Sequence, residues 1–166
     1  MSGPSIVALP EGFDRWNEVL GLISKAFAYM DGVIDPPSSA HLLTADALRT
    51  KAETETCLLA VAGPQIVGCV FLAERRDSLY IGKLAVSASM QRSGLGRRLV
   101  EAAAACARRA GKPALVLQTR VELTGNQAAF ARLGFREIER TAHQGYDRPT
   151  SITMRRELKA PAREPE

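Results

Sequence analysis

Residues 84–99 read LAVSASMQRSGLGRRL, which combines an apolar strand-like start, a turn with two glycines, and the beginning of a helix. The helix is expected to begin near Leu95, because apolar residues then recur at steps of three or four, the spacing of one buried helical stripe. The members of this stripe are Leu95, Leu99, Ala103, Cys106 and Ala110. The segment Gly111-Lys112-Pro113 supplies the stop signal. The chain is therefore organised around a strand, a glycine turn and a helix.

The start of this helix carries a charge that its own dipole disfavours. Arg92, Arg97 and Arg98 gather where free backbone N–H groups and the positive end of the macrodipole lie. A bound anion would resolve the conflict, and Gly94 and Gly96 would let it approach the backbone. The alternative is a tight turn whose glycines only relieve strain. The three-glycine dinucleotide fingerprint and the Walker pattern are both absent, so we predict a different kind of pyrophosphate-binding turn.

The same residues resemble the acetyl-CoA motif of the GNAT superfamily of N-acetyltransferases. The match consists of Leu84, Val86, Gln91, Gly94 and Gly96, with Ala88 where a proline is often found. A second signature is Leu133-Gly134-Phe135, which resembles the end of the fourth family helix and follows Asn126 and Phe130. The two motifs and the strands between them cover residues 57–158.

The resemblance implies a fold and an acyl donor. The fold is of the α/β (α+β) class: a mixed, mostly antiparallel sheet of about seven strands, with splayed parallel strands 4 and 5 and helices on both faces. The donor is acetyl-CoA, whose pantetheine arm would enter the splay, with the Val86 N–H donating to the thioester oxygen. The implied acetyl-CoA contacts are Leu84, Ala85, Val86, Gln91, Arg92, Ser93, Gly94, Leu95, Gly96, Arg97, Asn126 and Phe130.

Composition and charge narrow the class of protein. With 166 residues, 46% of them hydrophobic, residues 1–158 are expected to form a single domain, followed by a frayed tail over residues 159–166. Six basic residues lie within residues 90–112 against Glu101, whereas the remaining chain is nearly balanced. A local basic patch suits one polyanionic ligand, so we expect no nucleic-acid partner.

The cysteines and the N-terminal residues indicate the compartment. Cys57, Cys69 and Cys106 lie in apolar surroundings without paired spacing, which predicts reduced core residues and neither a metal site nor a disulfide. Residues 1–10 lack the features of a signal peptide, and no apolar run of about 18 residues exists. We therefore expect a cytoplasmic protein without a membrane partner, and leave a homodimer open.

The remaining chain reads as alternating strands and helices. Asp14 is the expected N-cap of a helix that carries Trp16, Val19, Leu20, Ile23 and Phe27, and a second helix is expected from Thr44 or Asp46 to about Ala52. The break at residues 29–39 borders the acceptor site in the family. Strands are expected at residues 5–9, 57–62, 65–73, 78–86, 114–119, 135–141 and 151–158, with a short helix at residues 124–133.

The catalytic residues are the weakest part of the pattern. Relatives often carry a carboxylate on the fourth strand as the general base. Residues 79–86 hold only Tyr80 and Lys83 as titratable groups, so the base must come from Glu74, the loops or water. In relatives a tyrosine that acts as the general acid often stands where this chain has Phe130. Tyr146, Tyr80 or solvent must therefore donate the proton to the departing thiolate. His41 is expected to be a surface or capping residue.

The loop at residues 143–149 is dense in polar groups and corresponds to the acceptor side of the family cleft. We expect Tyr146 to line the thioester and Asp147 or His143 to attract the incoming amine. The alternative for Asp147 is a surface pair with Arg148 or a turn cap.

The resemblance predicts an N-acetyltransferase that moves the acetyl group of acetyl-CoA to a primary amine by direct attack. The acceptor is a small-molecule amine or a protein amine, and its identity is open, as is the use of longer acyl donors. Because the usual acid is missing, the alternative is a non-catalytic acyl-CoA-binding sensor or interaction module.

Overall fold

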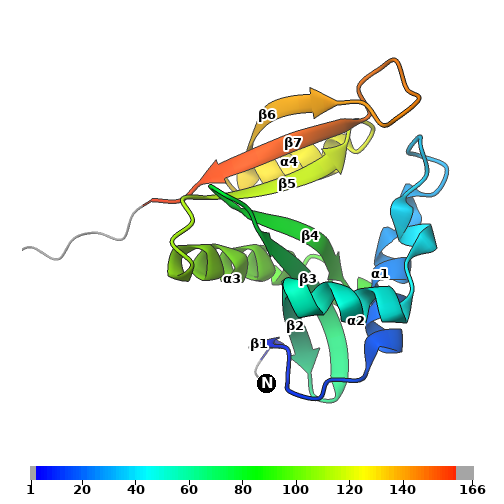
Figure 1. The fold of residues 1–166 in the computed structure, drawn as a ribbon. Coiled ribbons are helices and arrows are strands. Elements are labelled where there is room, and N and C mark those ends of the chain that lie inside the picture. Colours follow the sequence, from blue (N-terminus) through cyan, green and yellow to red (C-terminus); the bar gives the residue numbers. More distant parts are fainter. Residues whose placement is uncertain (1–2, 160–166) are drawn as a thin grey trace, which may run out of the picture.

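The computed structural model describes residues 3–159, which form one seven-stranded sheet flanked by four α-helices (Figure 1). The strand order is β1-β2-β3-β4-β5-β7-β6, antiparallel except between β4 and β5. The strands are β1 (Ser5–Ala8), β2 (Thr56–Ala62), β3 (Gln65–Glu74), β4 (Leu79–Val86), β5 (Ala114–Arg120), β6 (Arg136–Thr141) and β7 (Ser151–Glu157). The α-helices are α1 (Trp16–Phe27), α2 (Ala45–Thr54), α3 (Leu95–Arg109) and α4 (Thr124–Arg132). The predicted fold class is confirmed.

Helices cover both faces of the sheet, as predicted. Side chains alternate along a strand, so Val70 and Leu72 of β3 pack in the cluster that contains α3, whereas Cys69 and Phe71 pack with α1 and α2. This explains why the central strands read as continuous apolar runs: both of their faces are buried. The two clusters form separate cores on the two sides of the sheet.

The parallel pair β4 and β5 separates soon after it begins. Cα pairing is limited to Leu79 with Leu115 and Tyr80 with Val116, and beyond these residues the two strands diverge (Figure 1). A β-bulge accompanies the separation. Cys69 of β3 faces Ala85 while Phe71 faces Gly82, so β4 holds one residue more than β3 between these pairs.

The bulge is centred on Lys83, whose φ is 50°. A bulged strand bends and twists more strongly than a regular one, which carries the end of β4 away from β5. Beyond the bulge, the Ser87 N–H donates to the Val67 carbonyl at 2.8 Å. Since successive N–H groups along a strand point to opposite edges, the Val86 N–H points away from β3 and toward the splay.

Two helix predictions need correction. Arg15, without a side-chain cap bond, occupies the N-cap of α1 in place of Asp14. In α3 the buried stripe is Leu95, Leu99, Val100, Ala103, Ala104 and Ala107, whereas Cys106 is only partly buried and Ala110 is exposed. The helix faces the sheet with a wider stripe than a strict three-four spacing implies, and it ends at Arg109. Thr44 caps α2 as predicted, accepting from the Ala47 N–H at 3.0 Å.

Two of the three cysteines, Cys57 and Cys69, are core residues as predicted. Cys57 and Cys69 are buried free thiols, and Cys106 is a partly buried one. Burial raises the pKa of Cys57 to about 12, so this thiol stays protonated. None of the helices within residues 3–159 is both long and apolar enough to span a membrane. Of the predicted tail, residues 160–166 lie outside the described chain.

Candidate active site

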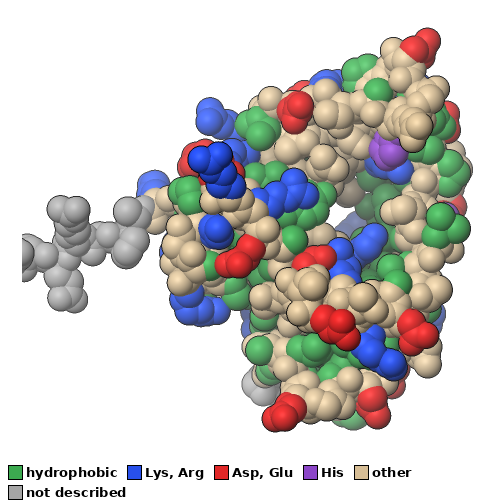
Figure 2. All heavy atoms as spheres, in the orientation of Figure 1, with side chains coloured by type: hydrophobic (Ala, Val, Ile, Leu, Met, Phe, Trp, Pro, Cys, Tyr) green, Lys and Arg blue, Asp and Glu red, His purple; other side chains and the backbone are tan. Residues whose placement is uncertain are grey.

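A cavity of about 380 Å³ occupies the splay between β4 and β5. Its walls are residues 80–84 of β4, residues 117–120 of β5, Asn126 and Phe130 of α4, and side chains from the segment that joins α1 to α2. In the space-filling view, Lys and Arg side chains gather around a hollow at the middle of the molecule (Figure 2). The bulge at Lys83 and the splay therefore produce an opening between the two halves of the sheet.

The predicted anion-binding turn follows directly after β4. Gly94 is the N-cap of α3 with φ 84°, and Arg92 also has a positive φ, 64°. The first turn of α3 contains no acidic residue. Within residues 3–159, the N–H groups of Arg92 and of residues 94–97 have no hydrogen-bond acceptor. Five free donors beside arginines provide the local chemistry of an anion site.

The remaining residues of this turn have local structural contacts. The Ser93 hydroxyl donates to the Met90 carbonyl, which closes a short turn. A Cβ on Gly96 would lie 3.9 Å from Cγ2 of Val86, so the start of α3 sits against the end of β4. Leu84 lines the cavity, whereas the Ala85 side chain is buried in the core, so only its backbone is available to a ligand.

Asn126 and Phe130 of α4 both line the cavity, and their contact with acetyl-CoA stays a prediction. The Asn126 amide donates to the Tyr29 hydroxyl at 2.8 Å, a contact that links α4 to the segment following α1. The Phe130 ring packs edge-to-face on Phe135, with 5.8 Å between ring centroids. Phe130 forms part of the cavity wall on the α4 side, and Phe135 supports it from the core.

The three residues predicted for catalysis do not lie together. Tyr80 lines the cavity, and burial raises the pKa of its hydroxyl against the opposing effect of Arg75, whose guanidinium lies 4.2 Å from the ring centroid. Glu74 is exposed at the end of β3, opposite Leu79, where β4 begins, and is not part of the cavity lining. The geometry gives no support to Glu74 as a base.

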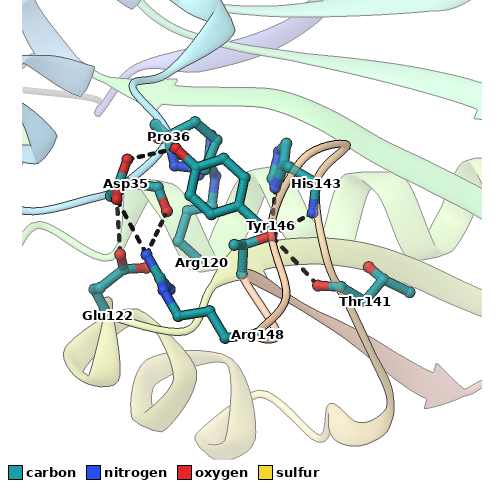
Figure 3. A network of polar contacts seen from close by, with 9 residues as sticks. Asp35, Pro36, Arg120, Glu122, Thr141, His143, Tyr146 and Arg148 are labelled. Carbon is teal, nitrogen blue, oxygen red and sulfur yellow. Dashed lines mark hydrogen bonds and ion pairs between the residues drawn. The ribbon is translucent and has the colours of Figure 1, made fainter.

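Tyr146, the third residue, belongs to a polar network at the edge of the cavity (Figure 3). Its hydroxyl donates to Oδ1 of Asp35 at 2.6 Å, and the Arg148 guanidinium contacts Oδ2 of the same carboxylate at 3.2 Å. The Asp35 N–H donates to Glu122 at 2.9 Å. Arg148 thus pairs with Asp35 and not with Asp147, and Tyr146 lies outside the set of residues that line the cavity.

His143 of the same loop does line the cavity. Its Nδ1 lies within hydrogen-bond distance of the Thr150 hydroxyl, which is also 3.4 Å from the Thr141 carbonyl (Figure 3). If that hydroxyl donates to Thr141, Nδ1 carries the ring proton and Nε2 is free to accept one. Burial, and secondarily the charge of Arg120, lowers the pKa of His143, so the ring is neutral at pH 7. His41 instead pairs with Asp31 at 2.7 Å on the surface.

The structure adds lining residues that sequence reasoning missed. Lys51 of α2 lines the cavity beside Lys83, and Thr119 of β5 has a buried hydroxyl oxygen without a hydrogen-bond partner in the described chain. A buried hydroxyl without a partner is rare in proteins, and this one belongs to a residue of the cavity wall. These residues come from segments far apart in the sequence, and no local pattern singles them out.

Comparison with known proteins agrees with this geometry. The family model described as the acetyltransferase (GNAT) family matches residues 16–135, well over half of the chain. The chain belongs to the GNAT acetyltransferase family. The match spans α1, both faces of the sheet, the turn at Gly94 and the Leu133-Gly134-Phe135 signature, so the predicted resemblance is confirmed.

Solved GNAT structures share the fold. The chain is similar to a GNAT family acetyltransferase from Elizabethkingia anophelis with acetyl-CoA bound, at 19% identity and a TM-score of 0.68, covering 95% of this chain and 100% of that one. An acetyltransferase from Streptococcus agalactiae matches at 17% identity and a TM-score of 0.74, covering 95% and 100%. A Bacillus subtilis acetyltransferase in complex with CoA matches at 21% identity and a TM-score of 0.66, covering 94% and 99%.

Proposed function

We propose that this GNAT protein transfers the acetyl group of acetyl-CoA to a primary amine by direct attack of the amine on the thioester. The observation that carries the proposal is the continuity of the splay with the turn at Gly94. A cavity between β4 and β5 lies next to a helix start with free N–H groups and arginines. A ligand with a diphosphate at one end and a neutral arm at the other matches both parts.

The residues present suit acetyl-CoA. The diphosphate would accept from the N–H groups of Arg92 and residues 94–97, with the guanidinium groups of Arg92 and Arg97 adding charge. The pantetheine arm would follow the free edge of β4 past Leu84 and Ala85, as an added strand. Rotation of the Thr119 side chain would turn its orphaned hydroxyl toward the cavity and give the arm one more partner. Two of the solved relatives bind acetyl-CoA or CoA.

The transfer requires an unprotonated amine, because an ammonium has no lone pair for attack. Among the lining side chains, His143 is neutral at pH 7 and is the candidate to accept the proton that the acceptor's ammonium loses, directly or through water. Attack would form a tetrahedral oxyanion, which the Val86 N–H is oriented to receive. The attacking nitrogen then loses a proton to water, and collapse breaks the C–S bond to give the amide and a thiolate, a tolerable leaving group with a thiol pKa of about 8.5.

Proton donation to the thiolate has two candidates on the chain. Tyr80 lines the cavity, and its raised pKa keeps the hydroxyl protonated at neutral pH. Tyr146 is the second candidate, provided that its hydroxyl leaves Asp35 when substrates bind. Neither is essential for a measurable rate, since proximity and oxyanion stabilisation contribute most of the acceleration in such a site.

The test is turnover by the purified protein. The protein is incubated with acetyl-CoA and a panel of amines, free thiol is measured over time, and the products are identified by mass spectrometry. We expect thiol release that depends on one class of amine and a matching N-acetylated product. Binding of acetyl-CoA without acetylation of any amine would support the alternative, a non-catalytic acyl-CoA-binding module.

A further inference from the structure

The charged groups around the cavity are unevenly distributed. Within the described chain, three lining residues are basic (Lys51, Lys83 and Arg120), and none of the lining residues is Asp or Glu. His143 is neutral at pH 7, as argued above, and Tyr80 stays protonated. The cavity that receives the acceptor is therefore electropositive.

Two of the three cations already have partners in the described chain, a carboxylate for Lys51 and two backbone carbonyls for Arg120. The Lys51 ammonium lies 2.7 Å from Glu55, whose side chain is only 15% exposed. Arg120 donates to the Pro36 and Pro37 carbonyls, and the negative charges of Glu122 and Asp35 act on it. The ion pair offsets the charge of Lys51, and the two hydrogen bonds occupy N–H donors of Arg120.

Lys83 differs from both. No carboxylate within residues 3–159 lies within 4.0 Å of its ammonium, although Glu55 acts on it from a greater distance. The residue is half-buried at the bulge, its φ is 50°, and the thiol of Cys69 donates to its carbonyl at 3.4 Å. Burial and the nearby Lys51 charge lower the pKa of Lys83, which is the expected condition of a cation that lacks a partner.

From these contacts we infer that the acceptor amine carries one negatively charged group, such as the carboxylate of an amino acid, and that the Lys83 ammonium binds this group. The inference rests on the proposed acetyl transfer. Within residues 3–159, Lys83 is the lining cation that has neither an ion pair nor a hydrogen-bond acceptor, and its single charge matches one anionic group on the acceptor. The about 380 Å³ cavity must also hold the acetyl end of the donor, which favours a small acceptor.

The same charge argues against cationic acceptors. A polyamine or an aminoglycoside would bring two or more positive charges into a cavity whose lining, within residues 3–159, contains three basic residues and no carboxylate. An amine beside a carboxylate avoids this conflict. Once its carboxylate is bound, the nearby positive charges also lower the pKa of its ammonium, which eases the proton loss that attack requires.

The test compares acceptors that differ only in charge. The twenty amino acids and phosphoethanolamine are assayed with acetyl-CoA, then the carboxamide of each accepted amino acid, then spermidine as a polycation. We expect an anionic amine to exceed its uncharged counterpart in kcat/KM by about 10- to 100-fold, the range of a charged hydrogen bond. Amino acids and phosphoethanolamine distinguish a carboxylate from a phosphate.

Variants assign the preference to Lys83. Lys83→Met should lower kcat/KM for the anionic acceptor by about 10- to 100-fold, mainly through KM, and leave the carboxamide nearly unchanged. Lys83→Arg should keep most of the preference. Lys25→Met, on the exposed side of α1, is the matched control and should change neither. Thermal melting and acetyl-CoA affinity establish that each variant is folded.

Three results would overturn the inference. The first is a carboxamide or spermidine acetylated as well as the anionic amine, which leaves the proposed function standing. The second is an equal loss for charged and uncharged acceptors in Lys83→Met, which would give Lys83 a role in the chemistry instead. The third, acetyl-CoA binding without acetylation of any amine, would overturn the proposed function as well.

Discussion

The Tyr146 hydroxyl donates a 2.6 Å hydrogen bond to Oδ1 of Asp35, a residue 111 positions earlier in the chain. This contact joins the loop between β6 and β7 to the segment between α1 and α2 (Figure 3). Both segments contribute to the cavity wall, through His143 on one side and Ile34 on the other. The hydrogen bond to the carboxylate also raises the pKa of Tyr146. The pair acts as a clasp across one edge of the candidate active site.

The clasp predicts a binding effect for Tyr146→Phe. Losing the hydroxyl should loosen the wall and raise KM for the acceptor several-fold, with kcat reduced by less than about 10-fold. Asp35→Ala removes this hydrogen bond and the contact with Arg148, so it should raise KM at least as much, and the double variant should be no worse than Asp35→Ala alone. Steady-state kinetics on any accepted amine provide the measurement. A fall in kcat of about 100-fold in Tyr146→Phe alone, with unchanged acetyl-CoA affinity, would instead make Tyr146 the proton donor.

His143 as base predicts a pH profile. Because its pKa lies below the ordinary histidine value, the ring should stay neutral, and kcat/KM should stay constant, as the pH falls from 8 to about 6.5. Activity should decline only at lower pH, where the ring gains its proton. His143→Gln should lower kcat/KM by about 100-fold and abolish this acid limb. An unchanged acid limb in the variant would assign the titration to another group.

Much of this architecture is visible in the sequence because periodicity is a local property. The strands, the helix starting at Leu95 and the turn at Gly94 follow from apolar spacing and glycine placement. The bulge at Lys83 could not be predicted, since a lysine with a positive φ leaves no compositional signal. The N-cap of α1 is Arg15, one residue after the predicted Asp14, because helix ends cannot be located to within one residue from sequence.

The residues of the candidate site likewise include some that are contiguous in sequence and some that only the fold brings together. The glycine turn is contiguous in sequence, so its residues could be selected together. Lys51, Thr119 and His143 meet only through the topology, and the clasp between Asp35 and Tyr146 joins segments that no local pattern relates. Glu74 was selected for its charge and its nearness in sequence to β4, but the strand pairing puts it at the wrong end.

Gly68 on β3 offers a stability test of the packing between the sheet and α3. A Cβ there would lie 3.1 Å from Cδ1 of Leu99, 3.2 Å from Cβ of Ala60 and 3.3 Å from the Ala85 carbonyl oxygen. Gly68→Ala should therefore lower the free energy of unfolding by about 1–3 kcal/mol, the typical cost of overpacking. Urea denaturation measures the difference.

The control for Gly68 is Gly21→Ala in α1, where a Cβ meets no atom within 4 Å. Alanine has a higher helix propensity than glycine, so the free energy of unfolding of this variant should rise by about 0.5–1 kcal/mol. Equal stability of Gly68→Ala and the wild type would contradict the close approach of β3 to α3.

The turn at Gly94 can be tested by acetyl-CoA titration in a calorimeter. Valine at Gly94 strains a φ of 84° and brings a side chain to the free N–H groups, so Gly94→Val should abolish measurable binding. Gly111→Val is matched closely, since Gly111 follows the other end of the same helix at φ 72° and also has no atom within 4 Å of a Cβ. Gly111→Val should lower the free energy of unfolding by a similar amount and keep the wild-type affinity for acetyl-CoA. Full binding by Gly94→Val would remove the turn from the site.

The central claim, acetyl transfer at the splay between β4 and β5, is tested most directly by following the acetyl group itself. The protein is incubated with acetyl-CoA labelled with ¹³C in the acetyl group and with the amine panel, and labelled products and free CoA are quantified together. We predict one labelled N-acetyl amine for each CoA released by the wild type and by Gly111→Val, and neither product with Gly94→Val. Release of CoA without a labelled amine, or retention of intact acetyl-CoA with every amine, would contradict the account.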